Sequence, residues 1–281
     1  MKLFYDKTAI TTMDDARSHY AADEFASPTR STVASLSWLE HEISALDSLL
    51  KELEMPDVCD LHLEYTVEPR QGDGEASHTD LMVISGESSL AVEVKWTEPR
   101  YDTVGKWLTK GPNPLNRCKV LTGWLGLLQK HAMHELYIED FSGAVYQMVH
   151  RAASACAVGK MPRLAYLVFK PSPDPRTADI QTIHKDLTNL WSLLGNPKGF
   201  PFYLVEVHLS PTAAYKAIES LPKRDKATAE QVKAALFGSD RLFKFGKYHL
   251  TKVGAKIMIP TGYGEDALVD QRSTVPGVGK V

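Results

Sequence analysis

The sequence is poor in long apolar runs and in cysteine. No apolar run reaches the roughly 18 residues of a membrane-spanning helix, and the opening residues MKLFYDKTAITTMDD lack the apolar stretch and cleavage site of a signal peptide. The three cysteines, Cys59, Cys118 and Cys156, form no CxxC pair, which argues against a disulfide framework and a thiolate zinc site. We therefore expect a cytoplasmic protein without a membrane partner, whose thiols are buried small side chains.

Several catalytic signatures are also absent. The chain has no GxSxG motif of serine hydrolases. In HAMHE, His131 and His134 stand three apart and do not form the HExxH pattern of zinc proteases. The GYGED stretch near residue 264 lacks the strand-to-helix context and the lysine of a phosphate-binding loop, so we interpret it as a turn.

The chain has little net charge, but its charges are unevenly spread. A formal net charge of −3 argues against a protein that coats nucleic acid by bulk positive charge. Residues 40–68 hold nine acids and one base, whereas residues 216–256 hold ten bases and four acids. Either segment taken alone is typical of a solvated face. Taken together they favour a polyanion docked on the basic segment, and we predict that Lys244, Lys247 and Lys252 contact nucleic acid there.

Hydrophobic periodicity predicts an α/β fold. Apolar residues at spacings of three and four predict one helix over residues 31–54, which Ser31 or Thr32 begins and Pro56 ends. Further strands are predicted at 59–69, 79–83, 90–96, 163–170 and 202–209, and further helices at 116–131, 141–158 and 180–194. The order is helix, three strands, helices, strand, helix, strand. We expect a core over residues 1–210 and a basic C-terminal extension packed on it over residues 211–281.

The stretch HTDLMVISGESSLAVEVKW, residues 78–96, predicts a β-hairpin with a two-residue turn. If Gly86 and Glu87 are the central residues of the turn, glycine holds the first position, as a type II′ turn demands. Ser85 then faces Ser88, and the register of the whole hairpin follows from this pair.

One face of this hairpin is chemically unusual. Counting outward from the turn, Asp80 faces Glu93, and because side chains alternate between the two faces of a strand, Lys95 shares the face of Glu93. Val92 and Val94 point to the other side, into the core. The register therefore predicts that two carboxylates and one lysine converge.

Two opposed carboxylates repel each other unless a positive charge lies between them. A divalent cation meets this need, and hard oxygen ligands suit Mg²⁺, which keeps several waters and takes one or two protein carboxylates. Mn²⁺ is the alternative ion. The lysine beside them orients a water or stabilises charge that develops on a phosphate. Two carboxylates that bind a metal ion, with a lysine beside them, are the groups needed for phosphodiester hydrolysis.

These residues resemble the motif of the PD-(D/E)xK phosphodiesterases, the restriction-endonuclease-like superfamily. TDLMV carries Asp80, and VEVKW carries Glu93 and Lys95 at the spacing D-x12-ExK. The predicted order of helix, three strands, helix and strand over about residues 31–170 is similar to the superfamily core, a mixed β-sheet flanked by helices. Thr79 stands where the family's name has proline, as in divergent members.

The resemblance also implies roles for individual residues. Asp80 and Glu93 bind the metal together with the backbone carbonyl of Val94, and Lys95 is the catalytic lysine. Many members add an acid from the first helix. We assign this ligand to Glu40, with Glu42 and, on the first strand, Glu64 as alternatives. A polar cluster on the helix after the core consists of Gln147, His150 and Arg151, which we expect to contact the metal site or the phosphates.

Two functions from different classes follow. The first is a divalent-metal-dependent nuclease acting on DNA, in which the basic C-terminal part seats the backbone. Because cutting both strands often calls for two active sites, a homodimer is expected. The second is a catalytically inactive nuclease-fold module that binds nucleic acid or protein, in which Lys95 and Glu93 form a simple salt bridge.

Overall fold

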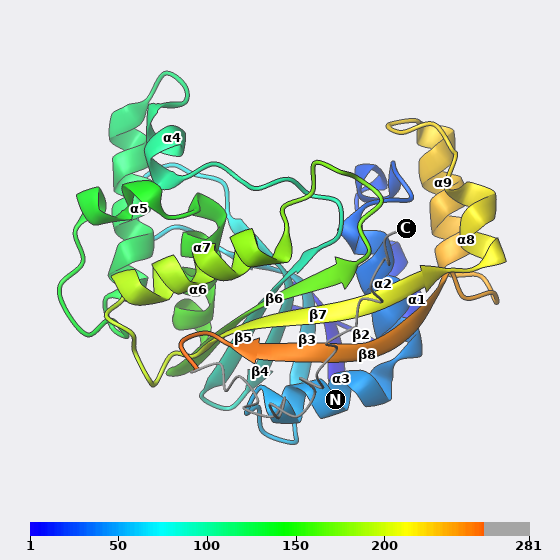
Figure 1. Ribbon diagram of the computed structural model, residues 1–281, viewed down its shortest axis with the longest axis horizontal. Helices are drawn as coiled ribbons and strands as arrows, with labels where there is room; N and C mark the ends of the chain where they lie inside the picture. Colours follow the sequence, from blue (N-terminus) through cyan, green and yellow to red (C-terminus); the bar gives the residue numbers. More distant parts are fainter. Residues whose placement is uncertain (256–281) are drawn as a thin grey trace, which may run out of the picture.

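An eight-stranded mixed β-sheet lies at the centre of the computed structural model, which describes residues 1–255 (Figure 1). The strands lie side by side in the order β2-β1-β3-β4-β5-β6-β7-β8. Their bounds are β1 (Lys2–Tyr5), β2 (Thr8–Ile10), β3 (Asp60–Val67), β4 (Ser77–Ser85), β5 (Ser88–Lys95), β6 (Met161–Lys170), β7 (Phe202–Pro211) and β8 (Phe243–Lys252). The GYGED stretch and the end of the predicted extension lie outside the described residues.

Helices cover both faces of the sheet (Figure 1). They are α1 (Met13–Arg17), α2 (Ser31–His41), α3 (Ile43–Glu52), α4 (Val104–Thr109), α5 (Pro114–Leu128), α6 (Tyr146–Val158), α7 (Ile180–Leu193), α8 (Ala213–Ile218) and α9 (Lys226–Leu236), with short 3-10 helices η1 (Ala22–Phe25) and η2 (Ile138–Gly143). One apolar core joins the sheet to α1, α2, α3, α8 and α9, and a second joins it to α4, α5, α6 and α7. Within residues 1–255 no helix has the length and apolar character needed to cross a membrane.

The predicted order of elements is confirmed for the centre of the sheet. β3, β4 and β5 form an antiparallel meander, after which β5, β6 and β7 run parallel. Parallel neighbours need a crossover connection, and here helices α4 to α6 connect β5 to β6 while α7 connects β6 to β7. The strands β1, β2 and β8 extend this sheet beyond what the sequence pattern predicted.

The predicted register of the hairpin between β4 and β5 is also confirmed. Ser85 pairs with Ser88, so the turn consists of Gly86 and Glu87 alone. Gly86 has φ 56°, a left-handed conformation that glycine adopts without steric cost, whereas Glu87 keeps a negative φ. A positive φ at the first central residue only is the mark of a type II′ turn.

The single helix predicted over residues 31–54 is wrong, because the structure has two helices there. Glu42 leaves the helical conformation, with φ −125° and ψ 40°, and separates α2 from α3. Ile43 belongs to the apolar residues that predicted the single helix, and it is 49% exposed. The break allows α3 to turn its own apolar stripe into the core shared with α2, and this stripe consists of Leu46, Leu49 and Leu50.

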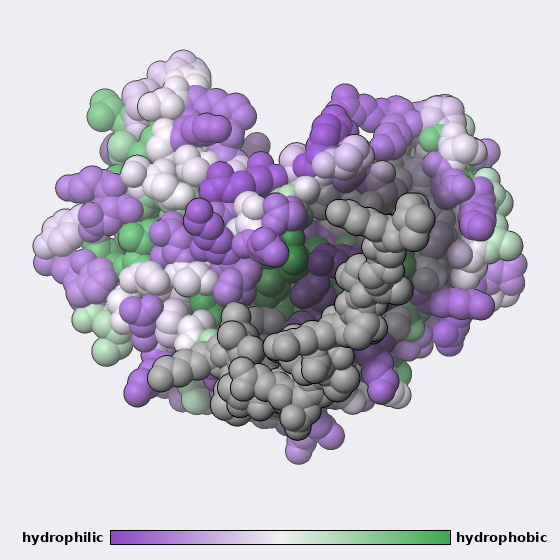
Figure 2. Space-filling view, viewed as in Figure 1, coloured by the Kyte–Doolittle hydropathy of each residue, from purple (hydrophilic) through white to green (hydrophobic). Residues whose placement is uncertain are grey.

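The C-terminal part of the described chain completes the sheet. β8 pairs antiparallel with β7, and α8 and α9 pack into the same apolar core as α2. The predicted extension therefore begins at the end of β7 and supplies the edge strand of the sheet. On the face seen in Figure 2 the surface is hollowed between the two groups of helices, and hydrophobic residues are visible in the hollow.

Candidate functional site

The strands β4 and β5 separate where the predicted acids lie. Their last paired residues are Leu81 and Val92, beyond which β4 continues beside β3 and β5 continues beside β6. Asp80 and Glu93 are the next residues on the two strands, so they stand at the opening of a fork. The backbone N–H of Val94 donates to Asp80 Oδ2 at 2.6 Å, which ties this carboxylate to the neighbouring strand across the fork.

Glu93 is held between two cations. Its Oε1 accepts a hydrogen bond from Lys95 Nζ at 2.6 Å, and its Oε2 accepts one from Arg151 Nε on α6. The exposed fractions of Glu93, Lys95 and Arg151 are 2%, 6% and 7%. Burial alone raises the pKa of a carboxyl group, but Arg151 and Lys95 outweigh it and hold the pKa of Glu93 below its usual range. Burial likewise opposes the charge of Lys95, yet Glu93 outweighs it and raises the pKa of Lys95. All three side chains are therefore charged.

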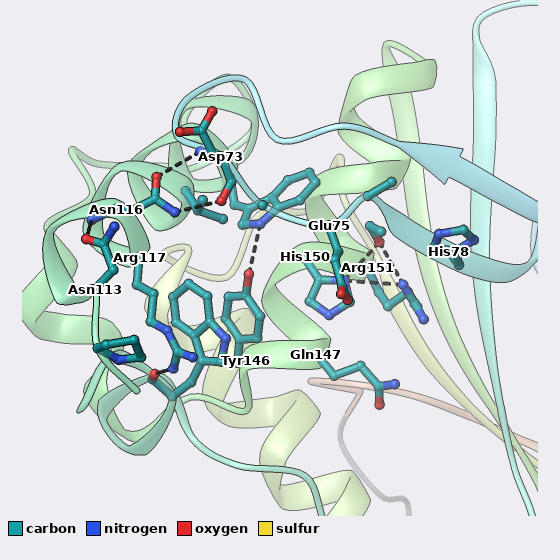
Figure 3. Close-up of a pocket in the computed structure, with 17 residues that line it drawn as sticks. Asp73, Glu75, His78, Asn113, Asn116, Arg117, Tyr146, Gln147, His150 and Arg151 are labelled. Atoms are coloured by element: carbon teal, nitrogen blue, oxygen red, sulfur yellow. Dashed lines mark hydrogen bonds between the residues drawn. The ribbon is translucent and has the colours of Figure 1, made fainter. Parts of the chain in front are cut away.

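Arg151 also connects this group to the start of β4. Its Nη1 donates to Ser77 Oγ at 2.7 Å, and Ser154 Oγ donates to the same oxygen at 3.0 Å. His150 Nδ1 lies 2.8 Å from Ser77 Oγ (Figure 3). Burial, Arg151 and Lys95 lower the pKa of His150 well below its usual value, so this imidazole is neutral. The predicted polar cluster of α6 is thus next to the fork.

On the α2 side of the fork, Glu64 lies close to Asp80. The register of β3 against β4 places the two residues opposite each other. Both line a narrow cleft with three hydroxyl side chains from the first turns of α2, Ser31, Thr32 and Ser35. Burial and the charge of Asp80 raise the pKa of Glu64 well above its usual range, and burial and the charge of Glu93 raise the pKa of Asp80 to about 7.

The backbone of Glu64 is unusual as well. Its φ of 50° lies in the left-handed region, which few residues other than glycine adopt. Such a conformation costs on the order of 1–3 kcal/mol and is often found at functional sites. The strained position therefore supports a role for this carboxylate.

The structure does not bring the helix acids to Asp80. Glu40 is exposed in the last turn of α2, about 7 Å along the helix axis from Ser35, which faces the fork. Glu42 makes an ion pair with Arg241 at 3.3 Å. Of the three candidates for the upstream ligand, Glu64 is the one that lies beside Asp80.

The three predicted lysines of the basic segment lie on β8, away from the fork. β6 and β7 stand between β5 and β8, and three strand spacings amount to about 14 Å. Lys244, Lys247 and Lys252 are exposed, and Lys252 Nζ makes an ion pair with Glu54 at 2.6 Å. The structure therefore does not bring them together with the polar cluster of α6.

One protein family matches most of the chain. The family model of a domain of unknown function (DUF6946) matches residues 9–201. The chain belongs to this family. No curated protein and no solved structure matches the chain. The DUF6946 region contains the whole fork and its partners on α2 and α6, whereas β8 and its lysines lie beyond it.

Within the DUF6946 region the structure adds residues that the sequence pattern did not indicate. The ring of Tyr101 covers Lys95, with Nζ 4.4 Å from the ring centroid. Arg100 anchors this segment through two hydrogen bonds to Asp186 on α7, at 2.7 and 2.9 Å. The buried hydroxyl of Tyr166, a residue that pairs with Glu93 across β5 and β6, has no hydrogen-bond partner among residues 1–255. No sequence motif marks these residues, because their role depends on how the segment after β5 folds back.

The fork thus combines two kinds of acidic site. Glu93 has a full set of cationic partners, whereas Asp80 and Glu64 have no hydrogen-bonded cation among the described residues. No group of three or more His, Cys, Asp or Glu side chains in residues 1–255 is arranged to hold a metal ion. Two carboxylates in one cleft nevertheless form a hard oxygen donor set, and Mg²⁺ commonly takes one or two protein carboxylates and fills its other positions with water.

Proposed function

We propose that this DUF6946 protein is a divalent-metal-dependent nuclease of the PD-(D/E)xK, restriction-endonuclease-like kind, acting on DNA. The observation that carries the proposal is the fork between β4 and β5, with Asp80 on one strand, bonded to the backbone N–H of Val94, and Glu93 and Lys95 on the other strand. The order of α2, the β3–β5 meander, α6 and β6 supports it, because it is the order expected of this superfamily. Fold alone does not select a reaction, so the proposal depends on the side chains.

In this proposal Asp80 and Glu64 hold Mg²⁺ or Mn²⁺. Their donor atoms suit a hard cation, and burial, followed by the charge of a neighbouring carboxylate, raises the pKa of both groups, so a cation in the cleft would favour their ionised forms. A bound ion at this place supplies a Lewis acid and lowers the pKa of a coordinated water. The predicted coordination by Glu93, Val94 and Glu40 stays a prediction, and the two cations on Glu93 argue against that residue as the main ligand.

Lys95 has the charge and position to assist the reaction. Glu93 fixes its ammonium group beside the fork and keeps it protonated, so it can stabilise charge that develops on a phosphate. Tyr101 covers this group, and Lys95 is only 6% exposed. A phosphate that contacts Lys95 therefore has to displace the ring of Tyr101.

A specific observation favours the second candidate, a catalytically inactive nuclease-fold module. Both carboxylate oxygens of Glu93 are engaged by buried cations, as in a structural ion-pair network. Such a network needs no metal. The binding of nucleic acid at the β8 lysines and the formation of a homodimer remain predictions under both candidates.

A cleavage assay separates the two candidates. Plasmid, linear duplex and single-stranded DNA are incubated with the full chain in Mg²⁺, Mn²⁺ or EDTA. We expect cleavage in either metal and none in EDTA, and a rate that falls about a hundredfold or more in Lys95→Ala, because the lysine serves the transition state. Arg151 still pairs with Glu93 in this variant, so circular dichroism should show a folded protein, with a lower stability because one buried ion pair is lost.

The matched control is Lys160→Ala. Lys160 is an exposed lysine that pairs with Glu87 at the far end of the hairpin, with 79% of its side chain accessible. It should cleave as the wild type does. Cleavage by Lys95→Ala at the wild-type rate removes Lys95 from the mechanism, and no cleavage by the wild type in either metal supports the inactive module.

A further inference from the structure

A second cavity of about 620 Å³ lies beside the fork, between α4, α5, α6 and the segment that leads into β4 (Figure 3). Its volume is in the range of small-molecule binding sites. Trp107 and Tyr146 form one wall, Asn113 and Arg117 lie at the rim, and the α6 residues Gln147, His150 and Arg151 line the floor. None of these wall or rim residues has a role in the fork.

The aromatic wall is fixed in place by several contacts. The rings of Trp107 and Tyr146 stack at 3.7 Å with an interplanar angle of 10°, and Trp124 Nε1 donates to Tyr146 Oη at 3.2 Å. The Arg117 guanidinium lies over the Trp107 ring, 5.2 Å from its centroid. Because Tyr146 and Arg117 both lie against the Trp107 ring, the face of Tyr146 turned away from Trp107 is the part of this wall on which a flat, unsaturated ring such as a nucleobase can stack.

Gln147 indicates that the cavity is built for a polar ligand. The residue is 9% exposed and lines the cavity, yet its amide makes no hydrogen bond to any residue in 1–255. The amide atoms of Gln147 are not among the solvent-inaccessible side-chain atoms that lack a partner, so they open onto the cavity and are free to bond to a ligand there. An amide offers one donor and one acceptor side by side, which is the pattern that pairs with the edge of a base.

The charges around the cavity select among nucleotides. Arg151 is already paired with Glu93, and the remaining cation, Arg117, is opposed by Asp73 and Glu75, which also line the cavity. A free nucleoside triphosphate brings several negative charges and finds no net positive charge here. One nucleotide within a strand brings a single phosphate charge and fits this balance better.

The cavity is continuous with the fork. Gln147 lies between it and the small cavity over Lys95, and Arg151 lines it while donating to Glu93. Ser77, at its floor, precedes Asp80 by three residues on β4, a separation of about 10 Å. A strand bound at the fork therefore has this cavity next to it, at the distance of about two nucleotides or less.

We infer that this cavity holds one unpaired nucleotide of the substrate strand, with the base beside Tyr146 and its edge bonded to Gln147. The inference deepens the proposed function and depends on it for the identity of the ligand. A base within a duplex is stacked and paired and must be turned out before it enters such a pocket. The substrate class is accordingly single-stranded nucleic acid, or a duplex at an unpaired position.

Binding in EDTA tests this inference without cleavage. A fluorescently labelled single strand of twelve nucleotides and the matching duplex are titrated with the full chain, and anisotropy gives both dissociation constants. We expect the single strand to bind at least tenfold more tightly than the duplex. Gln147→Leu keeps the size of the side chain and removes the amide, so it should weaken single-strand binding about tenfold without lowering the melting temperature. The matched control is Gln181→Leu on the exposed face of α7, which should bind as the wild type does.

The outcomes distinguish the inference from the proposed function. Equal affinity for single strand and duplex overturns the inference, and so does Gln147→Leu with wild-type affinity. Tight single-strand binding that depends on Gln147, in a protein that cleaves nothing, supports the pocket and rejects the nuclease. Cleavage of duplex by the wild type and Gln147→Leu at one rate rejects the pocket and keeps the nuclease.

Discussion

The two sides of the fork contain the same kind of side chain in opposite electrostatic states. Toward α6, Glu93 lies between Lys95 and Arg151, and its pKa is lowered. Toward α2, Asp80 and Glu64 share a cleft, and the pKa of each is raised. Burial acts in the same direction on all three carboxyl groups, so the difference comes from the charges of their neighbours.

This difference indicates at which of the two sites the protein already compensates the carboxylate charge. The Glu93 group satisfies its own charge, and an added cation on that side competes with Arg151 and Lys95 for the same oxygens. The Asp80 and Glu64 pair has no such partner among the described residues, and a cation there removes a repulsion. The comparison therefore indicates that the ion pairs of Glu93 mainly stabilise the fold, and that a metal ion binds at Asp80 and Glu64.

The largest expected effect, on the free energy of unfolding, comes from removing one of the two cations that pair with Glu93. Arg151→Met removes one cation from a buried ion pair and leaves Glu93 with Lys95 alone. Breaking a buried pair from one side typically costs about 3–5 kcal/mol, because a buried charge loses its partner. Urea unfolding of the metal-free protein should show a loss of this size.

The control for this prediction is Arg241→Met. Arg241 pairs with Glu42 at 3.3 Å, and 55% of its side chain is accessible. Exposed pairs contribute about 0–1 kcal/mol. If the two variants lose equal stability, the buried pair of Arg151 and Glu93 does not stabilise the fold more than an exposed pair does.

The sequence predicted the Glu93 side of the fork better than the Asp80 side. Gly86 and the alternation of β4 and β5 determine the hairpin register locally, so the positions of Asp80 and Glu93 as the next residues beyond the last pair could be counted from the turn. The choice of Glu64 could not be made this way, because it depends on the register of β3 against β4 and on the placement of α2, which keeps Glu40 and Glu42 away.

Longer-range contacts explain the other differences. The pairing of Arg151 with Glu93 joins residues 58 positions apart, and only the placement of α6 over β5 determines it. β8 alternates apolar and polar residues, but its basic character pointed to a nucleic-acid surface. Charged side chains are also a common feature of edge strands, where they discourage association with other sheets. The sequence pattern did not distinguish these two explanations.

A smaller effect on the free energy of unfolding should come from binding of a metal ion at Asp80 and Glu64. The metal-free wild type should gain about 2.7 kcal/mol of stability when Mg²⁺ is present at 100 times its dissociation constant. Glu64→Gln should lose most of this gain, since it removes one of the two carboxylates in the cleft. Glu40→Gln, the matched helix acid that is exposed and distant, should keep it. Thermal unfolding with and without Mg²⁺ measures both, and the reverse result would place the ligand on α2.

The smallest effect, over the single pH unit in which it is measured, concerns the protonation of Asp80. The pKa of Asp80 is raised to about 7 in the folded protein, against about 3.9 in the unfolded chain. Between these values the folded state keeps a proton that the unfolded state has lost, so stability falls as the pH rises, by at most about 1.4 kcal/mol per pH unit. The decrease begins near pH 4 and ends as the pH passes 7.

Asp80→Asn removes this titration, so unfolding in EDTA between pH 5.5 and 6.5 should show a shallower decline for the variant than for the wild type. The control is Asp174→Asn. Asp174 makes hydrogen bonds to Arg176 that lower its pKa, so its titration falls below this window and the wild-type slope should persist. Equal slopes in the wild type and Asp80→Asn would mean that Asp80 is ionised throughout, and that its charge, like that of Glu93, is already compensated within the protein.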